Sequence, residues 1–307
     1  MLHKPSGLKK GDKIAIVAPC GIFDKKKFRA GINFIREIGL VPVLAPGLFK
    51  KDFIFAGTIK ERVSSFMKMA RRNDIKAMWC VRGGYGGYAV AQELAKFKAP
   101  RNPKVIIGHS DVFAIHMVCI QKWRWPGLHA PLVDRIGKDE VPSAEKKNIR
   151  QTLMNPEFRL TVNRHLRSMG KKTSVLGILT GGNLAMAASS LKTNWEIQTD
   201  GKILLLEDIG ERAYRIDRML FQLQAAGKLA KLKGVVIGDF TGCEEPDGKE
   251  LWLKALERYF KKAPYPVIYG MKAGHGPLRL TLPLGTRVKI QGGGKSMFEV
   301  VESYACE

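Results

Sequence analysis

Residues 105–116 read VIIGHSDVFAIH and run from a short apolar strand through a serine into a helix. The β-branched residues favour a buried strand, and the apolar spacing after Asp111 predicts an amphipathic helix. A serine on such a turn is pushed out at the carboxyl edge of a sheet, beside the positive end of the helix dipole, which is the geometry of a nucleophile elbow. The stretch lacks the second glycine of the GxSxG form. The alternative is that Ser110 or Asp111 caps the helix, and the local sequence leaves both interpretations open.

The same alternation of strands and helices extends through the N-terminal half. Helices between successive strands imply right-handed crossovers and a parallel sheet. We therefore expect an open, doubly wound α/β sheet in this half. The apolar runs predict strands at 13–18, 40–45, 77–81 and 105–107, and the helical periodicity predicts helices at 25–38, 59–72 and 88–95.

The second half is different in kind. Residues 142–172 are polar and basic with no strong strand, which indicates a crossover between domains. We predict an N-terminal α/β domain at 1–155, a crossover linker at 156–175 and a C-terminal mixed β/α domain at 176–307. Within the last domain the sequence predicts a Gly-Gly turn at 179–183, strands at 203–206 and 235–237, helices at 213–226 and 251–260, and short β runs at 286–290 and 297–301.

The composition excludes several classes of protein. A chain of 307 residues predicts about two domains, and 45% hydrophobic with 26% charged residues argue against a disordered or fibrous chain. Five cysteines without CxxC spacing argue against a disulfide framework or a zinc site.

The apolar runs also bear on the compartment. None reaches the roughly 20 residues of a membrane span. The run at 14–20 is too short for a signal peptide, so a buried first strand is favoured there. The cytoplasm is the default compartment, with export to the periplasm as the alternative.

The charge balance is unusual, because 52 basic and 28 acidic residues give a net charge of +24. A field of this sign attracts anions such as nucleic acid, anionic lipid or an acidic small substrate. The basic residues stand in short groups such as Lys25–Lys27, without zinc-finger spacing, an aromatic RNA-binding motif or a long basic tract. A solvated basic surface is therefore favoured over a nucleic-acid site.

Two residues are candidates to complete a catalytic site with Ser110, since a nucleophilic serine needs a base and the base needs an orienting acid. His275 lies in a Gly-His-Gly-Pro turn that no helix or strand needs, and the alternative is an exposed histidine. Glu207 ends the apolar run at 203–206, where a carboxylate points into the crevice at the sheet's carboxyl edge. Its alternative is a helix-start acid. The order Ser110, Glu207, His275 matches one known order of serine triads, which is weak support.

A glycine-rich loop, RGGYGG at 82–87, follows the predicted strand at 77–81 and opens a helix. It lacks the GxGxxG spacing and the lysine of a P-loop, which argues against dinucleotide or phosphate binding. A loop whose backbone N–H groups face a reacting oxyanion needs the same glycine freedom. Arg82 beside it is a candidate to hold a substrate carboxylate through two parallel hydrogen bonds; the alternative is a pair with a surface acid.

Taken together, these motifs resemble those of the LD-carboxypeptidase family of serine peptidases. Each fragment alone is modest support, but their joint order over nearly the whole chain is specific. The matching stretches are KKGDKIAIVAP at 9–19, RGGYG at 82–86, GHSD at 108–111, TGGNL at 180–184, LEDIGE at 206–211 with YRIDR at 214–218, and GH at 274–275 with LPLG at 282–285.

The resemblance implies a flavodoxin-like, doubly wound parallel sheet domain and a smaller, swivelling β/α C-terminal domain, with the site between them, in a homodimer. It implies that Ser110 is the nucleophile, His275 the general base and Glu207 the residue that orients the base. The backbone amides of Gly84 and Asp111 would form the oxyanion hole. The family reaction removes the terminal D-alanine from an L-centre of the murein tetrapeptide, as in peptidoglycan recycling, and implies no metal or organic cofactor.

Two departures from the family pattern bear on substrate detail. His109 stands where the family more often has Tyr or Phe, and residues 128–131, LHAP, have alanine in place of the glycine of a His-Gly-Pro segment. The basic charge suits an anionic muropeptide, and Arg82 and Tyr85 are the candidate substrate-binding residues. A second candidate function cleaves peptide–nucleotide conjugates with the same triad, and a third is a non-enzymatic polyanion binder.

Overall fold

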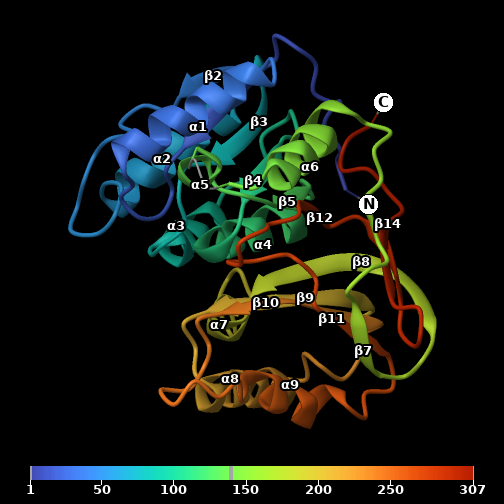
Figure 1. Ribbon diagram of the computed structural model, residues 1–307. Helices are drawn as coiled ribbons and strands as arrows, with labels where there is room; N and C mark the ends of the chain where they lie inside the picture. The colour runs from blue at the N-terminus through green and yellow to red at the C-terminus, as the bar shows by residue number, and fades with distance from the viewer. Residues whose placement is uncertain (1, 138–140, 307) are drawn as a thin grey trace.

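Two β-sheets with their helices stack on each other in the computed structural model, which describes residues 2–137 and 141–306 (Figure 1). The first sheet runs in the order β12 (Leu282–Leu284), β5 (Gly127–His129), β4 (Val105–Gly108), β3 (Ile75–Cys80), β1 (Lys13–Val17) and β2 (Val41–Leu44). Its neighbours pair in parallel except β12 with β5. The order β2-β1-β3-β4-β5 is that of a flavodoxin-like, doubly wound sheet, which confirms the predicted fold class.

Helices cover both faces of this sheet because its strands are buried on two sides. Ile14 and Ile16 of β1 pack into one core, and Ala15 and Val17 pack into the other. The first side carries α1 (Lys25–Glu37), α5 (Val133–Ile136) and α6 (Ser143–Met154), and the second carries α2 (Ile59–Ala70), α3 (Gly87–Leu94), the 3-10 turn η1 (Ser110–Val112) and α4 (Phe113–Gln121).

Local chemistry sets the helix ends. The Asp24 side chain accepts a hydrogen bond from the Lys27 amide (2.8 Å) at the start of α1. Thr58 and Glu61 form a reciprocal capping box at the start of α2. Gly39, with φ 90°, follows the end of α1 in the left-handed conformation that glycine adopts easily. These local signals explain why the sequence predicts both helices closely.

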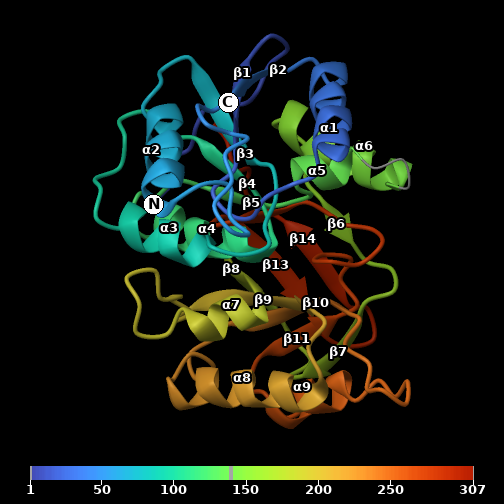
Figure 2. The same cartoon turned by 90° about the vertical axis from the view of Figure 1, so that its left-hand side faces the viewer.

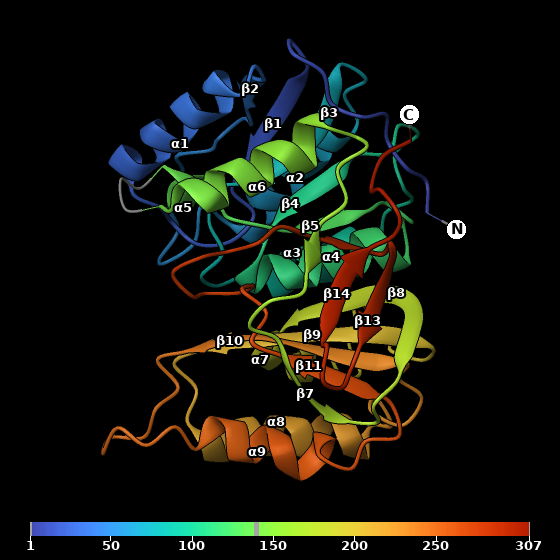
Figure 3. The same cartoon turned by 45° about the vertical axis from the view of Figure 1, so that its right-hand side comes forward.

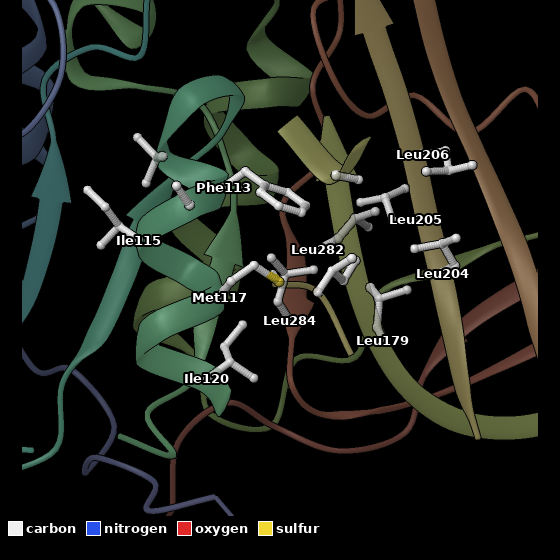
Figure 4. Packing of buried hydrophobic residues seen from close by; sticks show 14 of the residues in the cluster. Phe113, Ile115, Met117, Ile120, Leu179, Leu204, Leu205, Leu206, Leu282 and Leu284 are labelled. Carbon is white, nitrogen blue, oxygen red and sulfur yellow. The ribbon is translucent and has the colours of Figure 1, made fainter. Parts of the chain in front are cut away.

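The helix α4 differs from the prediction of an amphipathic helix. All residues from Phe113 to Ile120 are buried, because α4 lies between the first sheet and the second layer. Figure 4 shows Phe113 and Met117 directed toward Leu179 and Leu282, which belong to the C-terminal half. The amphipathic expectation is therefore wrong, since a helix enclosed by two sheets needs apolar residues all round.

The second sheet is mixed. It runs in the order β6 (Thr161–Val162), β14 (Met297–Val300), β13 (Arg287–Gln291), β8 (Ser174–Asn183), β9 (Lys202–Ile209), β10 (Gly234–Thr241), β11 (Pro266–Tyr269) and β7 (Arg167–Gly170). The central strands β8 to β11 pair in parallel and the outer ones antiparallel. Helix α7 (Leu184–Ser189) follows β8, and α8 (Ala213–Ala225) and α9 (Trp252–Phe260) cover the face that points away from the first sheet (Figure 1).

Two segments differ from the sequence expectation. Residues 142–172, for which the sequence predicts no strong strand, contain α6, β6 and β7. Both strands are short and pair with distant parts of the chain, so no local pattern reveals them. The Gly-Gly turn predicted at 179–183 is wrong, because β8 continues through it. Gly181 pairs with Leu205 and approaches it so closely that a Cβ would meet the Leu205 carbonyl oxygen.

The two halves of the chain interlock. The strand β12 comes from the C-terminal half but extends the first sheet through β5. Ser6 pairs with Cys306, so both chain ends lie against the first layer (Figure 3). The domain boundaries at 155 and 176 stay a prediction.

In residues 2–137 and 141–306, no helix is long and apolar enough to cross a bilayer. No group of three or more His, Cys, Asp or Glu side chains there has the geometry of a metal site. All five cysteines are free, and Cys306 alone of them is exposed.

Candidate active site

A cavity of about 1190 Å³ lies between the two layers. Gly83 and Ser110, which follow β3 and β4, line it from the first layer, and Asp208 and His275 line it from the second. Figure 2 shows α3 and α7, which also contribute lining residues, on either side of the boundary between the layers. Parallel sheets bind ligands in the crevice outside the carboxyl ends of their strands, and this cavity occupies that position.

Ser110 occupies the turn between β4 and α4. Its φ of 61° is positive, a strained conformation for a residue with a side chain, and such strain clusters at functional sites. Neither Ser110 nor Asp111 caps the helix, since both η1 and α4 begin without a side-chain hydrogen bond. The N-cap alternative is therefore wrong. The turn has the sharp geometry that a nucleophile elbow requires.

The glycine loop lies directly against this turn. Gly83 has no room for a side chain, because a Cβ there would come within 2.9 Å of the Ser110 Cβ. The amide of Gly87 donates a hydrogen bond to the buried Asp111 side chain and so ties the loop to the turn. Burial raises the pKa of Asp111 to about 6, against the opposing effect of that hydrogen bond. Gly84 and Asp111, the predicted oxyanion-hole residues, both line the cavity.

His275 and Glu207 form a hydrogen-bonded pair on the second layer. The His275 Nδ1 atom lies 2.8 Å from Glu207 Oε2. Burial would raise the pKa of Glu207, but its electrostatic and hydrogen-bonding interactions with His275 and His129 outweigh burial and hold that pKa well below its usual range. Because the carboxylate engages Nδ1, Nε2 is the ring nitrogen left for a nucleophile or substrate. Ser110 and His275, predicted to act together, line the same cavity.

The loop around His275 needs glycine on both sides. Gly274 has φ 119°, and a Cβ there would lie 2.5 Å from Glu207 Oε2. A Cβ on Gly276 would meet the carboxylate of Asp239. The Gly-His-Gly sequence is therefore explained by the close approach of the loop to two carboxylates.

Two further histidines, for which the sequence predicts no catalytic role, lie beside this pair. His129 Nε2 lies 3.5 Å from Glu207 Oε1, the oxygen that does not contact His275. The His109 ring centre is 4.9 Å from that of His275, and burial lowers the pKa of His109 well below its usual value, so a neutral imidazole lines the cavity. The only feature of the sequence that could have pointed to His129 as a site residue is its place at the end of a short strand, β5, which lies next to β4.

The two predicted substrate-binding residues lie at the cavity. Arg82 is half exposed, and its Nη1 atom lies 3.6 Å from Asp134 Oδ2. Tyr85 is 67% exposed and also lines the cavity. Since the ion pair of Arg82 is long and accessible to solvent, its guanidinium retains donors that can reach a carboxylate.

A buried arginine that is not among the predicted site residues supports the glycine loop. Arg62 of α2 donates through Nη1 to the carbonyl oxygens of Pro19 and Gly86, both at 2.7 Å, and through Nε to that of Gly57 at 2.9 Å. Its guanidinium also lies over the Phe55 ring, 5.0 Å from the centroid. Arg62 thereby links three loops. In the sequence it is indistinguishable from a solvent-facing helical arginine.

The loop that carries His275 is held from the first layer. Arg279 donates through Nη2 to the carbonyl oxygen of His275 at 2.9 Å, and its own amide donates to Glu145 Oε2 of α6 at 2.9 Å. Asn148 of the same helix accepts a hydrogen bond from the Thr281 amide at 2.7 Å. Helix α6 lies in the segment for which the sequence predicts only a crossover between domains. Its hydrogen bonds fix the position of the loop that carries His275, which we call the histidine loop.

Comparison with protein families gives two matches that follow one another along the chain. Residues 14–130 match the model of the LD-carboxypeptidase N-terminal domain. Residues 176–290 match the model of the LD-carboxypeptidase C-terminal domain. The first match contains Ser110, and the second contains Glu207 and His275.

Individual proteins match over nearly the full chain. The probable murein peptide carboxypeptidase of Bacillus subtilis is 33% identical over 96% of this chain and 93% of its own length. The microcin C7 self-immunity protein of Escherichia coli is 25% identical over 94% of this chain and 91% of its own. The crystal structure of muramoyltetrapeptide carboxypeptidase from Oxalobacter formigenes has a TM-score of 0.79 at 25% identity, covering 96% of this chain and all of that one.

Proposed function

This chain belongs to the LD-carboxypeptidase family and is therefore a peptidase, and from that premise we propose that it is a serine-type enzyme that removes the terminal D-alanine from the murein tetrapeptide. One observation carries the proposal. His275, which is hydrogen-bonded to the buried Glu207, lines the same cavity as Ser110, and Ser110 sits on a strained strand-to-helix turn.

The reaction follows from the roles assigned to these three side chains. Ser110 Oγ attacks the carbonyl carbon of the L-centre while His275 takes the hydroxyl proton. His275 then gives that proton to the amine of the departing D-alanine, and the peptide stays bound to Ser110 as an ester. A water molecule, deprotonated by His275, hydrolyses the ester and restores the serine. Glu207 holds the imidazole in one orientation and stabilises its charged form.

Two backbone amides are proposed to stabilise the negative oxygen of each tetrahedral intermediate. They belong to Asp111, which follows Ser110, and to Gly84, which follows the Gly83 that faces the Ser110 side chain; both line the cavity. Donors fixed before the reaction cost no reorganisation at the moment that charge develops. The bond from Gly87 to the Asp111 side chain supports this arrangement, because it holds the loop and the turn together.

Arg82 is proposed to receive the carboxylate of the terminal D-alanine, with Tyr85 beside it. A carboxypeptidase must recognise a free carboxylate, and a guanidinium does so through two parallel hydrogen bonds. If Arg82→Ala leaves kcat/KM within a few-fold of the wild type, another group reads the carboxylate.

A second candidate substrate is a peptide–nucleotide conjugate. The match to a microcin C7 self-immunity protein favours it, as do two exposed tyrosines, Tyr85 and Tyr88, on the cavity wall. Exposed aromatic rings can stack on a nucleobase. The same triad would cleave either substrate.

Mass spectrometry of the murein tetrapeptide after incubation with purified protein tests the proposal. The wild type is expected to produce the tripeptide, and Ser110→Ala to lose about 10⁴-fold in kcat. Ser64→Ala, at an exposed position of α2, is the matched control and should act as the wild type does. Retention of activity by Ser110→Ala would contradict the assigned nucleophile. An intact tetrapeptide alongside a cleaved conjugate would favour the second substrate.

We also propose that the enzyme works as a homodimer in the cytoplasm, in peptidoglycan recycling, as the family resemblance implies. Light scattering on a size-exclusion column would give the mass of the particle. Fractionation of the producing cells would give the compartment.

A further inference from the structure

A hairpin tip in the loop between β2 and α2 has a composition that folding does not explain. Asp52 and Phe55 exchange two backbone hydrogen bonds, at 3.0 and 2.8 Å, and leave Phe53 and Ile54 at the tip of a two-residue turn. Such turns normally carry Gly, Asn or Asp, because they require positive φ. Phe53 has φ 54° and is 84% exposed. The chain thus holds a bulky ring in a strained conformation where it packs little against the protein.

The tip belongs to a larger apolar surface. The Ile22 amide donates to the Ile54 carbonyl oxygen at 3.0 Å, so the backbones of the two segments lie side by side. The ring of Phe49 lies 5.7 Å from that of Phe23, the neighbour of Ile22. We call this patch the docking surface. Its exposed apolar members are Ile22, Phe49, Phe53 and Ile54.

Exposed lysine and arginine residues flank the apolar members of the docking surface, and we call these basic residues the basic frame. The segments 22–29 and 49–60 contain seven lysine and arginine residues against two aspartates. The Lys25 ammonium lies 5.7 Å from the centre of the Phe49 ring, and Lys50 pairs with Glu61 at 2.6 Å. The basic residues, all exposed, are Lys25, Lys26, Lys27, Arg29, Lys50, Lys51 and Lys60.

We propose that the docking surface binds the face of an anionic phospholipid bilayer. Phe53 and Ile54 enter the boundary between headgroups and acyl chains, and the surrounding lysines face the phosphates. An apolar wedge framed by basic residues is the composition of peripheral membrane-binding surfaces. The net charge of +24 attracts the same partner.

Two other partners fit the observations less well. A two-fold contact between copies of this chain would place the basic frame of one copy against that of the other, where like charges repel. Single-stranded nucleic acid binds through bases stacked on aromatic rings. Half of the exposed apolar residues here are isoleucines, which offer no ring.

The docking surface is joined to the rim of the cavity. The Gly21 amide donates to the Gly83 carbonyl oxygen at 3.0 Å, and the Phe55 ring packs against Gly86. Lys27 and Tyr85 line the cavity itself. Figure 2 shows the loop between β2 and α2 reaching toward the boundary of the two layers. A docked molecule would hold the cavity close to the bilayer, and this inference does not depend on the proposed reaction.

Vesicle flotation tests the proposal with the full chain. Large vesicles of phosphatidylcholine with about 30% phosphatidylglycerol are compared with pure phosphatidylcholine vesicles. The wild type should float with the anionic vesicles and at least tenfold less with the neutral ones, and about 0.5 M salt should weaken the binding. The double substitution Phe53→Ser with Ile54→Ser should lower the binding about tenfold, as should Lys26→Glu with Lys51→Glu.

Phe221→Ser is the matched control, because Phe221 is an exposed aromatic on α8, in the other layer. It should bind vesicles as the wild type does, and thermal melts followed by circular dichroism should show all variants folded. The proposal is overturned if the wild type ignores anionic vesicles, or if the Phe53 and Ile54 substitutions leave vesicle binding unchanged. It is also overturned if those substitutions turn a dimer into a monomer at unchanged vesicle binding, because the surface would then join two copies of the chain.

Discussion

Asn148→Ala is expected to impair both stability and catalysis, although Asn148 lies in helix α6 and does not line the cavity. Its Oδ1 atom accepts the Thr281 amide at 2.7 Å, and Thr281 is only 1% exposed. Water therefore cannot replace the lost acceptor, and a buried N–H left without a partner costs about 1–3 kcal/mol. In a chain of this size each kcal/mol lowers Tm by roughly 2–4 °C.

The effect on catalysis follows from what Thr281 adjoins. Arg279, two residues before it, donates to the carbonyl oxygen of His275 and is itself held by Glu145. Release of Thr281 loosens this connection. A displacement of the base by about 1 Å can cost about 10²-fold in rate. We therefore expect kcat to fall about ten- to hundredfold, with a smaller change in KM.

Scanning calorimetry and the kinetics of D-alanine release measure the two effects. Asn155→Ala, at the exposed position just after the same helix, is the control: its Oδ1 atom also accepts a backbone amide, that of Glu157 at 3.1 Å, but water can replace this bond, so neither Tm nor kcat should change appreciably. The reasoning fails if Asn148→Ala lowers Tm as expected while kcat stays within about threefold of the wild type. The histidine loop would then hold its position without α6.

Three further predictions concern the neighbourhood of His275. Gly274→Ala should abolish activity, because its Cβ would lie 2.5 Å from Glu207 Oε2. The control is Gly201→Ala, which is also at positive φ but has no atom within 4 Å and should only lose about 1 kcal/mol of stability. Steady-state kinetics and thermal melts compare the two variants. Glu207→Gln should lower kcat by about 10⁴-fold with the fold intact, and a loss below tenfold in the kinetic assay would speak against its orienting role. Burial raises the pKa of Asp239 to about 6 in the folded protein, with Lys272 opposing. Because this pKa lies above that of the unfolded chain, the carboxyl group stabilises the fold fully below about pH 4, and this stabilisation is lost as the pH rises through 6. Asp239→Asn should flatten this fall, at most about 3 kcal/mol, in melts between pH 4 and 7, and a wild-type slope in the variant would rule the assignment out.

Elements with a strong local signal were predictable from the sequence. The strands β1 and β3 and the helices α1 and α2 follow from apolar periodicity and from caps such as Thr58 with Glu61. The errors fall where tertiary contacts override that periodicity. Helix α4 is buried on all sides, and Gly181 continues a strand because its partner strand approaches too closely for a side chain.

The candidate site was predictable to a similar extent. Ser110 is marked by a strand-to-helix turn, Glu207 by the end of an apolar run, and His275 by flanking glycines. The structure brings all three to the cavity or into contact with its lining, and their chemical roles stay predictions. Arg62 and His129 were missed because each acts through contacts with residues far away in the sequence.

The sequence by itself determined the family, the doubly wound sheet and the positions of the chemically special residues, because each leaves a pattern over a few neighbouring residues. Only the tertiary structure decided how these residues meet. It showed that α6 holds the loop of His275, that β12 ties the second half into the first sheet, and that Phe53 stands exposed at the tip of the loop between β2 and α2. Such contacts join segments tens to hundreds of residues apart, and they depend on distances in space that no spacing along the chain encodes.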